Sequence, residues 1–302
     1  MSKVLCLLYH RVCFREDDIY NIAVSVDRFE EHIKYLSENY QIVRFEEDWN
    51  EASGDVVTIT FDDGYADNYR NALPILEKYK VPATIFITTG NIGKSEEFWY
   101  DELERLLTQG NISNNYFRLI DPVYEYQWET KTKEQRLEVA LTLRWLLRRD
   151  PSIDRRESWF QQLRNWAQLG KTGRYENVPL DVQQLKELGS SPYITIGGHT
   201  VTHRSLGALT EKEQENEIKQ SILYLEEVLG KNVEVFSYPF GQKADYTGET
   251  IELLKKYGII KAATTERRCA EMEKNLFKIP RIKIENLKIQ EFENFIKSSW
   301  GK

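Results

Sequence analysis

Two pairs of side chains in this sequence have the types and spacing needed to bind a divalent metal and activate water. His199 and His203, two of only four histidines in the chain, are four positions apart. On one helical turn this spacing points both imidazoles the same way, which lets two histidines share a metal ion. Asp62 and Asp63 stand side by side before Gly64, and either can complete a site of two histidines and one carboxylate.

Each pair also has a purely structural interpretation. Histidines that follow a strand can be surface or capping residues at the start of a helix, and a strand followed by Asp-Asp-Gly is a common turn. The metal interpretation is favoured because the histidine pair directly follows Gly197-Gly198 at a predicted strand end. Two carboxylates also suit such a site, since one neutralises the cation and the other accepts a proton from water.

A third motif, Val-Phe-Ser-Tyr-Pro-Phe-Gly at 235–241, occupies the same place relative to a predicted strand. The carboxyl ends of parallel strands meet on one face of a sheet or barrel, so three motifs at strand ends indicate one site. β-Branched runs predict the strands, and amphipathic periodicity predicts helices between them. The predicted strands are 4–10, 41–45, 56–61, 83–88, 193–197, 233–238 and 260–265.

The predicted helices alternate with these strands and therefore favour a parallel sheet, either open or closed into a barrel. The spacing of Asp27 and Glu30 predicts a capping box at the start of the first helix. Further helices are predicted over 72–79, 211–229 and 246–257.

The alternation stops between residue 99 and about residue 188. Apart from one short strand at 116–120, this stretch predicts only helices, over 102–107, 133–147 and 155–169. It is too long for a structureless loop. We therefore expect one domain spanning 1–302, with a helical insertion at about 99–188 that lies over one end of the sheet or barrel.

The composition limits which binding partners and which cellular compartment the chain is expected to have. The chain carries 41 basic and 48 acidic residues, a net charge of −7, and has no long basic run. This argues against a nucleic-acid or anionic-membrane partner. The three cysteines have no CxxC spacing and fit a reducing compartment, and the first apolar run is short and lacks a cleavage site. With no segment of the length a membrane helix needs, we expect a cytoplasmic protein of unknown oligomeric state.

The three motifs together resemble those of the polysaccharide deacetylases, the NodB-homology enzymes of carbohydrate esterase family 4. Thr60-Phe61-Asp62-Asp63-Gly64 is similar to the first family motif, His199-Thr200-Val201-Thr202-His203 to the second, and Ser237-Tyr238-Pro239-Phe240-Gly241 to the third. The resemblance runs from Leu8 to about Ile284. It implies an α/β fold, a distorted (β/α)7-type barrel, into which the helical insertion is placed.

The resemblance also implies roles for individual residues. Asp63, His199 and His203 would bind the metal, and Asp62 would be the general base. The backbone N–H of Phe240 would stabilise the oxyanion, a role that survives the replacement of the family's tyrosine because the donor belongs to the main chain.

Two departures from the family pattern matter. Ser237 stands where the third motif has an arginine that orients the base, and either Arg281 takes that place or Arg281 is a surface cation. No histidine follows His203, so the family's late acid histidine is missing. Tyr9-His10 matches the members that have a YH at the first strand, in which that histidine is the acid; otherwise His10 is a buried histidine bonded to a backbone carbonyl.

The expected activity is metal-dependent removal of N-acetyl groups from an N-acetylated sugar, polysaccharide or precursor. Zinc is the first expectation for the metal, and Co, Ni or Fe is also compatible. The sequence leaves other functions open: a deacylase of an O-acetyl ester or of a non-sugar amide, and an inactive sugar-binding module. A glycosidase fits poorly because adjacent carboxylates cannot lie on both sides of a glycosidic bond.

Overall fold

The computed structural model describes residues 3–16, 18–52, 54–110, 114–271 and 275–301. The chain forms two compact units. The barrel unit comprises Met1–Gly93 and Pro179–Lys302, and the inserted unit comprises Lys94–Val178. The predicted limits of the insertion, about 99 and 188, differ from these, because α6 (Val182–Ser190) belongs to the barrel unit.

Seven parallel strands form the distorted (β/α)7 barrel, in the spatial order β13-β1-β5-β6-β9-β10-β11. A parallel bridge between Ala263 and Ile279, just before β13, connects the two ends of this order. The seven strands are β1 (Lys3–Tyr9), β5 (Val56–Phe61), β6 (Ala83–Ile87), β9 (Ile194–Gly198), β10 (Val235–Ser237), β11 (Lys261–Ala263) and β13 (Ile282–Lys283). Short strands β4 (Gln41–Ile42) and β12 (Ala270–Glu271) extend the sheet at β5 and β1, and β2 (Arg11–Val12) pairs with β3 (Ala23–Val24).

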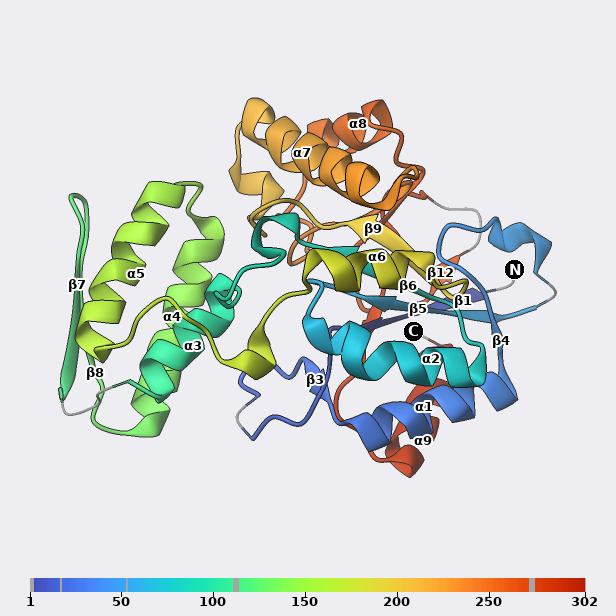
Figure 1. Cartoon of the computed structure of the whole chain (residues 1–302), viewed down its shortest axis with the longest axis horizontal. Helices are drawn as coiled ribbons and strands as arrows, with labels where there is room; N and C mark the ends of the chain where they lie inside the picture. Colours follow the sequence, from blue (N-terminus) through green and yellow to red (C-terminus); the bar gives the residue numbers. More distant parts are fainter. Residues whose placement is uncertain (1–2, 17, 53, 111–113, 272–274, 302) are drawn as a thin grey trace. The chain divides into compact units, whose positions relative to one another are not determined.

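In Figure 1, α1, α2 and α9 lie below the strands and α7 and α8 above them; all of these helices pack on the outer face of the barrel, in one apolar core with Leu5, Ile59 and Phe236. Every residue of β5 is buried, because one face of the strand lies against the helices and the other faces the barrel interior, where Val56 packs with Cys6 and Phe86. The α1 residues Phe29, Ile33 and Leu36 are buried as their spacing predicts. The helices are α1 (Val26–Asn39), α2 (Leu73–Tyr79), α7 (Glu211–Leu229), α8 (Gly248–Lys256) and α9 (Ile289–Ser299).

One local prediction about the helices is wrong, the capping box at the start of α1. Helix α1 begins after Ser25, and its N-cap has no side-chain hydrogen bond, so Asp27 and Glu30 form no capping box. Glu30 instead binds Lys78 and the hydroxyl of Tyr79. The helix predicted over 72–79 is preceded by a π-helical turn, Asn68–Ala72, which the apolar periodicity did not reveal.

The inserted unit consists of α3 (Trp99–Thr108), α4 (Lys133–Arg149), α5 (Ile153–Ala167) and the antiparallel pair β7 (Tyr116–Ile120) and β8 (Glu125–Glu129). The predicted helices and the strand at 116–120 are present, while β8 was not expected. Buried ion pairs strengthen the unit, such as Arg164 with Glu102 and Arg105 with Glu97, both at 2.7 Å. The expectation of a single domain with this insertion stays a prediction.

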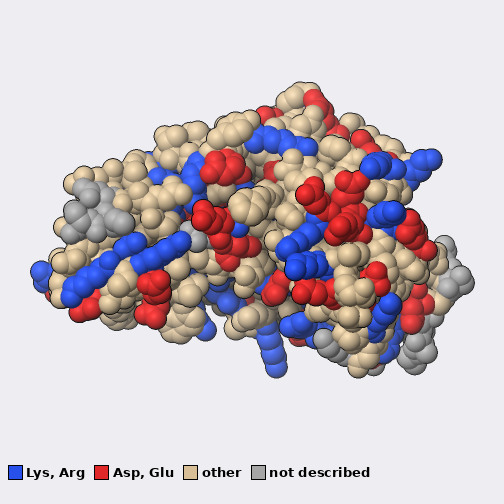
Figure 2. Space-filling view, turned by 90° about the horizontal axis from the view of Figure 1, so that it is seen from below, with Lys and Arg blue, Asp and Glu red and all other residues tan. Residues whose placement is uncertain are grey.

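The surface and the cysteines agree with the composition. Acidic and basic side chains are interspersed on the face shown in Figure 2. Among the described residues, no helix combines the length and apolar character needed to cross a membrane. Cys6, Cys13 and Cys269 are free thiols. Burial raises the pKa of Cys13 to about 12 and that of Cys6 further, so neither forms a reactive thiolate near neutral pH.

Candidate active site

The first motif of the site lies where β5 ends, beside the end of β1. Asp62 N donates to the carbonyl of Tyr9 at 3.1 Å, which continues the β1–β5 pairing by one residue. At Asp63 the backbone turns into the left-handed region, with φ 77°, and Gly64 follows at 86°. This turn sends the two adjacent carboxylates in different directions. Both are buried, with 3% exposure each.

Asp63, His199 and His203 come together as a group able to bind a metal. Their ligand atoms lie within 4.8 Å of one another, and all three residues are buried. Asp63 Oδ1 is 3.5 Å from Nε2 of His199 and 3.3 Å from Nε2 of His203. Nδ1 of His199 donates to the carbonyl of Ser237 at 2.7 Å, which fixes the ring with Nε2 facing the site.

The charged side chains of this candidate metal group shift one another's pKa values. Burial alone would raise the pKa of Asp63, but hydrogen bonds from His199 and His203 hold it well below its usual value. Burial lowers the pKa of His199, but the carboxylates of Asp62 and Asp63 outweigh it and raise that pKa. Asp63 is therefore ionised, as a metal ligand must be.

The two histidines do not share a helical turn, contrary to the prediction. Strand β9 ends at Gly198, and the loop that follows has positive φ at Thr200 (64°) and His203 (51°). These two left-handed residues, rather than the i, i+4 geometry of a helix, bring the imidazoles together. The ring centroids of the two histidines are 5.0 Å apart.

Glu217, on α7, holds this loop in place. Its buried carboxylate accepts hydrogen bonds from the N–H groups of Val201 at 2.9 Å and Thr202 at 2.8 Å, and from the Thr202 hydroxyl at 2.6 Å. Gly90 N donates to the carbonyl of Val201 at 2.8 Å on the other side. Glu217 was not predicted as a site residue, although its position on the buried face of an amphipathic helix was a usable signal.

Arg281 contacts Asp62 and Ser237, as expected if it replaces the arginine missing from the third motif. Its Nη1 and Nη2 donate to Oδ1 and Oδ2 of Asp62, both at 2.7 Å, and Nη2 also donates to Ser237 Oγ at 2.7 Å. Nε donates to the carbonyl of Thr264 at 2.9 Å. Arg281 is 1% exposed, so the alternative of a surface cation is wrong.

The guanidinium keeps Asp62 ionised. Burial alone would raise the pKa of Asp62, but Arg281 and His199 lower it below its usual value. The bidentate geometry also fixes the plane of the carboxylate, which a lysine could not do. Asp62 is therefore a charged, oriented acceptor next to the candidate metal group.

His10 follows β1 on the same face of the barrel. Its carbonyl accepts a hydrogen bond from Asn68 Nδ2 at 2.8 Å, and its ring is within electrostatic reach of Asp62 and Asp63. Burial lowers the pKa of His10 more strongly than the two carboxylates raise it. Among the described residues the buried Nδ1 of His10 has no hydrogen-bond partner, so within them this atom is not bonded to a backbone carbonyl.

The comparisons decide the family. A sequence model described as polysaccharide deacetylase matches residues 50–137 and 161–261, which is more than half of the chain. The chain belongs to the polysaccharide deacetylase family. YxkH of Bacillus subtilis strain 168, whose name also places it among the polysaccharide deacetylases, is 23% identical over 290 residues, covering 94% of this chain and 72% of that protein.

A second relative of this chain is named for a specific enzymatic activity. The poly-β-1,6-N-acetyl-D-glucosamine N-deacetylase of Staphylococcus aureus strain NCTC 8325 is 38% identical over 111 residues. That match covers 31% of this chain and 38% of the relative, well under half of its length.

Solved structures of two deacetylases share the fold. The Streptococcus pyogenes deacetylase PplD, in complex with acetate, aligns with a TM-score of 0.63 at 20% identity, over 99% of this chain and 98% of that one. IcaB from Ammonifex degensii aligns with a TM-score of 0.61 at 17% identity, over 99% and 98%. At these identities the likeness establishes the fold alone.

The third motif brings Phe240 to the candidate metal group. The Phe240 ring packs edge-on against His203, with centroids 4.9 Å apart. Phe240 and Gly241 both have positive φ, 63° and 64°, so the chain turns sharply here. Thr265 Oγ1 donates to the Phe240 carbonyl at 2.7 Å and anchors the turn.

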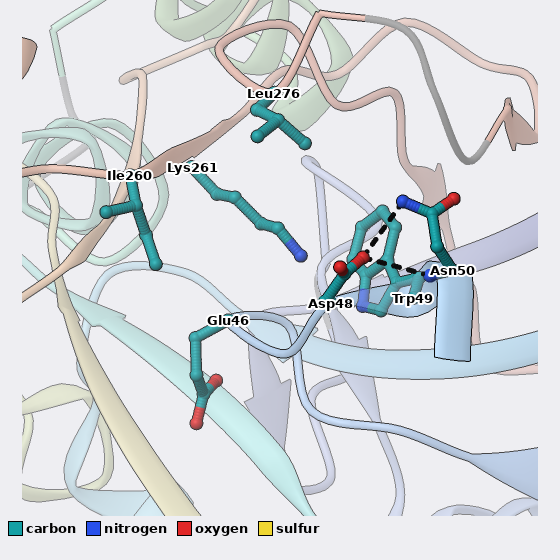
Figure 3. Close-up of a pocket in the computed structure, with 7 residues that line it drawn as sticks. All are labelled: Glu46, Asp48, Trp49, Asn50, Ile260, Lys261 and Leu276. Atoms are coloured by element: carbon teal, nitrogen blue, oxygen red, sulfur yellow. Dashed lines mark hydrogen bonds between the residues drawn. The ribbon is translucent and has the colours of Figure 1, made fainter. Parts of the chain in front are cut away.

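The fourth histidine and the pocket lie away from this chemistry. His32 is buried in α1, stacks on Phe292 at 3.7 Å and donates to the carbonyl of Leu287, so it is a packing residue. A pocket of about 330 Å³ lies at the amino end of β11, where Lys261 points towards Asp48 and Trp49 (Figure 3).

The ammonium of Lys261 already has partners in the protein. It donates to the carbonyl of Phe45 at 3.1 Å and lies 4.0 Å above the Trp49 ring. Burial lowers the pKa of Lys261 to about 8. Because the pocket belongs to the opposite end of the barrel from the three motifs, we assign it no part in the chemistry.

Proposed function

We propose that this chain is a metal-dependent hydrolase that removes N-acetyl groups from an N-acetylated carbohydrate. The observation that carries the proposal is the division of labour between adjacent carboxylates. Asp63 faces two imidazoles within 3.5 Å, while Asp62 is clamped by Arg281 through two bonds of 2.7 Å. Asp63 is thereby placed to bind a cation, and Asp62 is placed to accept a proton.

The residues present fit a divalent metal. Two imidazoles and one carboxylate form an open donor set that leaves positions for water and substrate, and it suits Zn, Co, Ni or Fe. The Nδ1–H of His199 is held by a backbone carbonyl, as metal-binding histidines usually require. When bound, the cation polarises the acetyl carbonyl and lowers the pKa of water towards about 7.

The chain's own residues supply the remaining steps. Asp62, held by Arg281, accepts the proton of the attacking water. The Phe240 N–H donates to the oxyanion that develops on the acetyl carbonyl. His10, when protonated, donates this proton to the departing sugar nitrogen, because an amide anion is too basic to leave. Since burial lowers the pKa of His10, its protonated ring is a stronger acid than a free imidazolium. The products are acetate and an amino sugar.

The substrate proposal draws on the relatives. One relative carries the name of a poly-β-1,6-N-acetyl-D-glucosamine N-deacetylase, so N-acetylglucosamine oligomers are the first substrates to test. Family membership supports an N-acetylated polysaccharide or its precursor as the substrate class.

The test combines metal content with acetate release. Protein purified without chelator should contain about one metal per chain and release acetate from N-acetylglucosamine oligomers in a metal-dependent way. Asp62→Asn should lower kcat at least 100-fold and keep the metal, while His199→Ala should lose both. Asp27→Asn, an exposed carboxylate on α1, is the control and should change neither.

Each component can fail separately. A fully active Asp62→Asn would overturn the base assignment. Wild-type protein that takes up no metal after supplementation would overturn the metal site. Bound metal without acetate release would overturn the assignment to N-acetyl groups.

A further inference from the structure

A buried polar network connects the segment after β1 to the start of the π-helix. Arg11 Nε donates to Asp67 Oδ2 at 2.9 Å, and Val12 N donates to Asp67 Oδ1 at 3.0 Å. Asn68 Nδ2 donates to the carbonyl of His10 at 2.8 Å and to Asp67 Oδ1 at 3.1 Å. Arg11 and Asn68 are 0% exposed and Asp67 is 6% exposed, so the network is dry and its geometry is fixed.

Asn68 begins a π-helical turn, a rare local structure that is found mostly at functional sites. It lies five positions after Asp63, on the loop that also carries Asp62. The same short segment therefore presents two carboxylates to the site and binds the backbone of His10. None of these contacts is needed to close the barrel, which the strand pairing already does.

Two buried atoms near this contact are complementary. His10 Nδ1 and Asn68 Oδ1 are both buried and have no hydrogen-bond partner among the described residues. Native structures rarely leave such atoms unsatisfied. Nδ1–H donates and an amide oxygen accepts, so a rotation of the His10 ring that brings Nδ1 to this oxygen would satisfy both atoms.

We propose that Asn68 is a positioning residue that orients the His10 imidazole for proton donation. Its amide nitrogen fixes the His10 backbone, and its amide oxygen takes the Nδ1–H, which directs Nε2 to the leaving group. The inference rests on the proposed function, in which His10 is the acid.

The leaving group provides a test of this role. When the acetyl C–N bond breaks, the sugar nitrogen must receive a proton from His10. When the acetyl C–O bond of p-nitrophenyl acetate breaks, nitrophenolate leaves with the electron pair and needs no proton. A residue that acts through His10 therefore affects the amide much more than the aryl ester.

The experiment compares both substrates in the metal-loaded, full-length protein. Asn68→Ala should lower kcat on N-acetylglucosamine oligomers by on the order of 10- to 100-fold, with the aryl ester within about twofold and the metal content unchanged. His10→Ala should show the same selectivity. The double variant His10→Ala/Asn68→Ala should lose no more than His10→Ala alone, because Asn68 then has nothing left to orient.

Asn71→Ala is the matched control. Asn71 Nδ2 donates to the carbonyl of Val12 at 2.7 Å, from the same π-helical turn to the same segment, but does not reach His10. It should leave the ratio of amide to ester hydrolysis unchanged. If Asn68→Ala does not fold, Asn68→Leu keeps the side-chain size and branching, loses both the donor to the His10 carbonyl and the acceptor for Nδ1–H, and should show the same selective loss.

The outcomes separate this inference from the proposed function. Equal loss on both substrates, no loss on either, or additive loss in the double variant would overturn the role of Asn68. If wild-type protein releases no acetate from the oligomers, the proposed function fails. The crystal structure of Asn68→Ala then decides: a displaced His10 ring supports the positioning role and an unmoved ring overturns it.

Discussion

Replacing Arg281 with methionine should destabilise the barrel unit and impair Asp62 at the same time. The pair is bidentate at 2.7 Å and buried, with side-chain exposures of 0% for Arg281 and 4% for Asp62. Removing one partner of a buried ion pair leaves an uncompensated charge and costs about 3–5 kcal/mol of unfolding free energy. In an Asp62→Asn background Arg281 is itself the uncompensated buried charge, so Arg281→Met should then cost under about 1 kcal/mol or stabilise the protein.

Denaturant unfolding of the cation-free protein, made with a chelator, measures this coupling as a double-mutant cycle. Arg268→Met is the control, because Arg268 is 47% exposed and meets Glu266 at 3.4 Å, and it should change stability by under about 0.5 kcal/mol. If Arg281→Met costs the same in both backgrounds, the two residues are not coupled and the account of Asp62 is refuted.

The same variant predicts a shift in the pH dependence of activity. Without the guanidinium, burial becomes the dominant influence on Asp62 and raises its pKa. A base must be ionised to accept a proton, so the acidic limb of the kcat/KM profile should move to higher pH. An unmoved limb would mean that this limb does not report Asp62.

Three further predictions follow from other parts of the fold. Burial lowers the pKa of His32 from 6.5 to about 4, so its contribution to stability is present above pH 6.5 and is lost as the pH falls towards 4, by up to about 3 kcal/mol. Denaturation at several pH values should show a flatter profile for His32→Gln. Glu217→Ala should weaken metal binding about 10- to 100-fold in chelator competition, while Glu227→Ala, at an exposed position near the end of the same helix, should not. A Cβ at Gly90 would lie 2.4 Å from the Val201 carbonyl oxygen, so Gly90→Ala should lower metal affinity in the same assay.

The sequence revealed the parts of the site that follow from strand position. β5 and α7 begin and end at the predicted residues, because buried β-branched runs and long amphipathic patterns are strong signals. Since Asp62 and His199 directly follow buried strands, their convergence could be predicted. The position of His10 at the end of β1 followed from the same rule.

Contacts that depend on backbone detail could not be predicted. The carbonyl of Ser237 that binds His199 leaves no signal in the sequence, because every residue has a carbonyl. The left-handed turns at Thr200 and His203 were missed because only glycine adopts that conformation routinely, and neither position is a glycine. The clamp of Arg281 on Asp62 remained one of two alternatives until three-dimensional packing placed it.

The clamp also has a consequence for how the protein acquires its activity. Asp62 and Arg281 are 219 positions apart in the chain. During synthesis the Asp62 carboxylate therefore exists long before its counter-charge, and burying it early would be costly. Completion of the site is thus linked to arrival of the last barrel segment, where Ile279 also bridges to Ala263. We expect a nascent chain that ends before this segment to keep the catalytic face of the barrel open. The barrel then closes in the same folding step in which the Asp62 carboxylate gains Arg281 as its counter-charge.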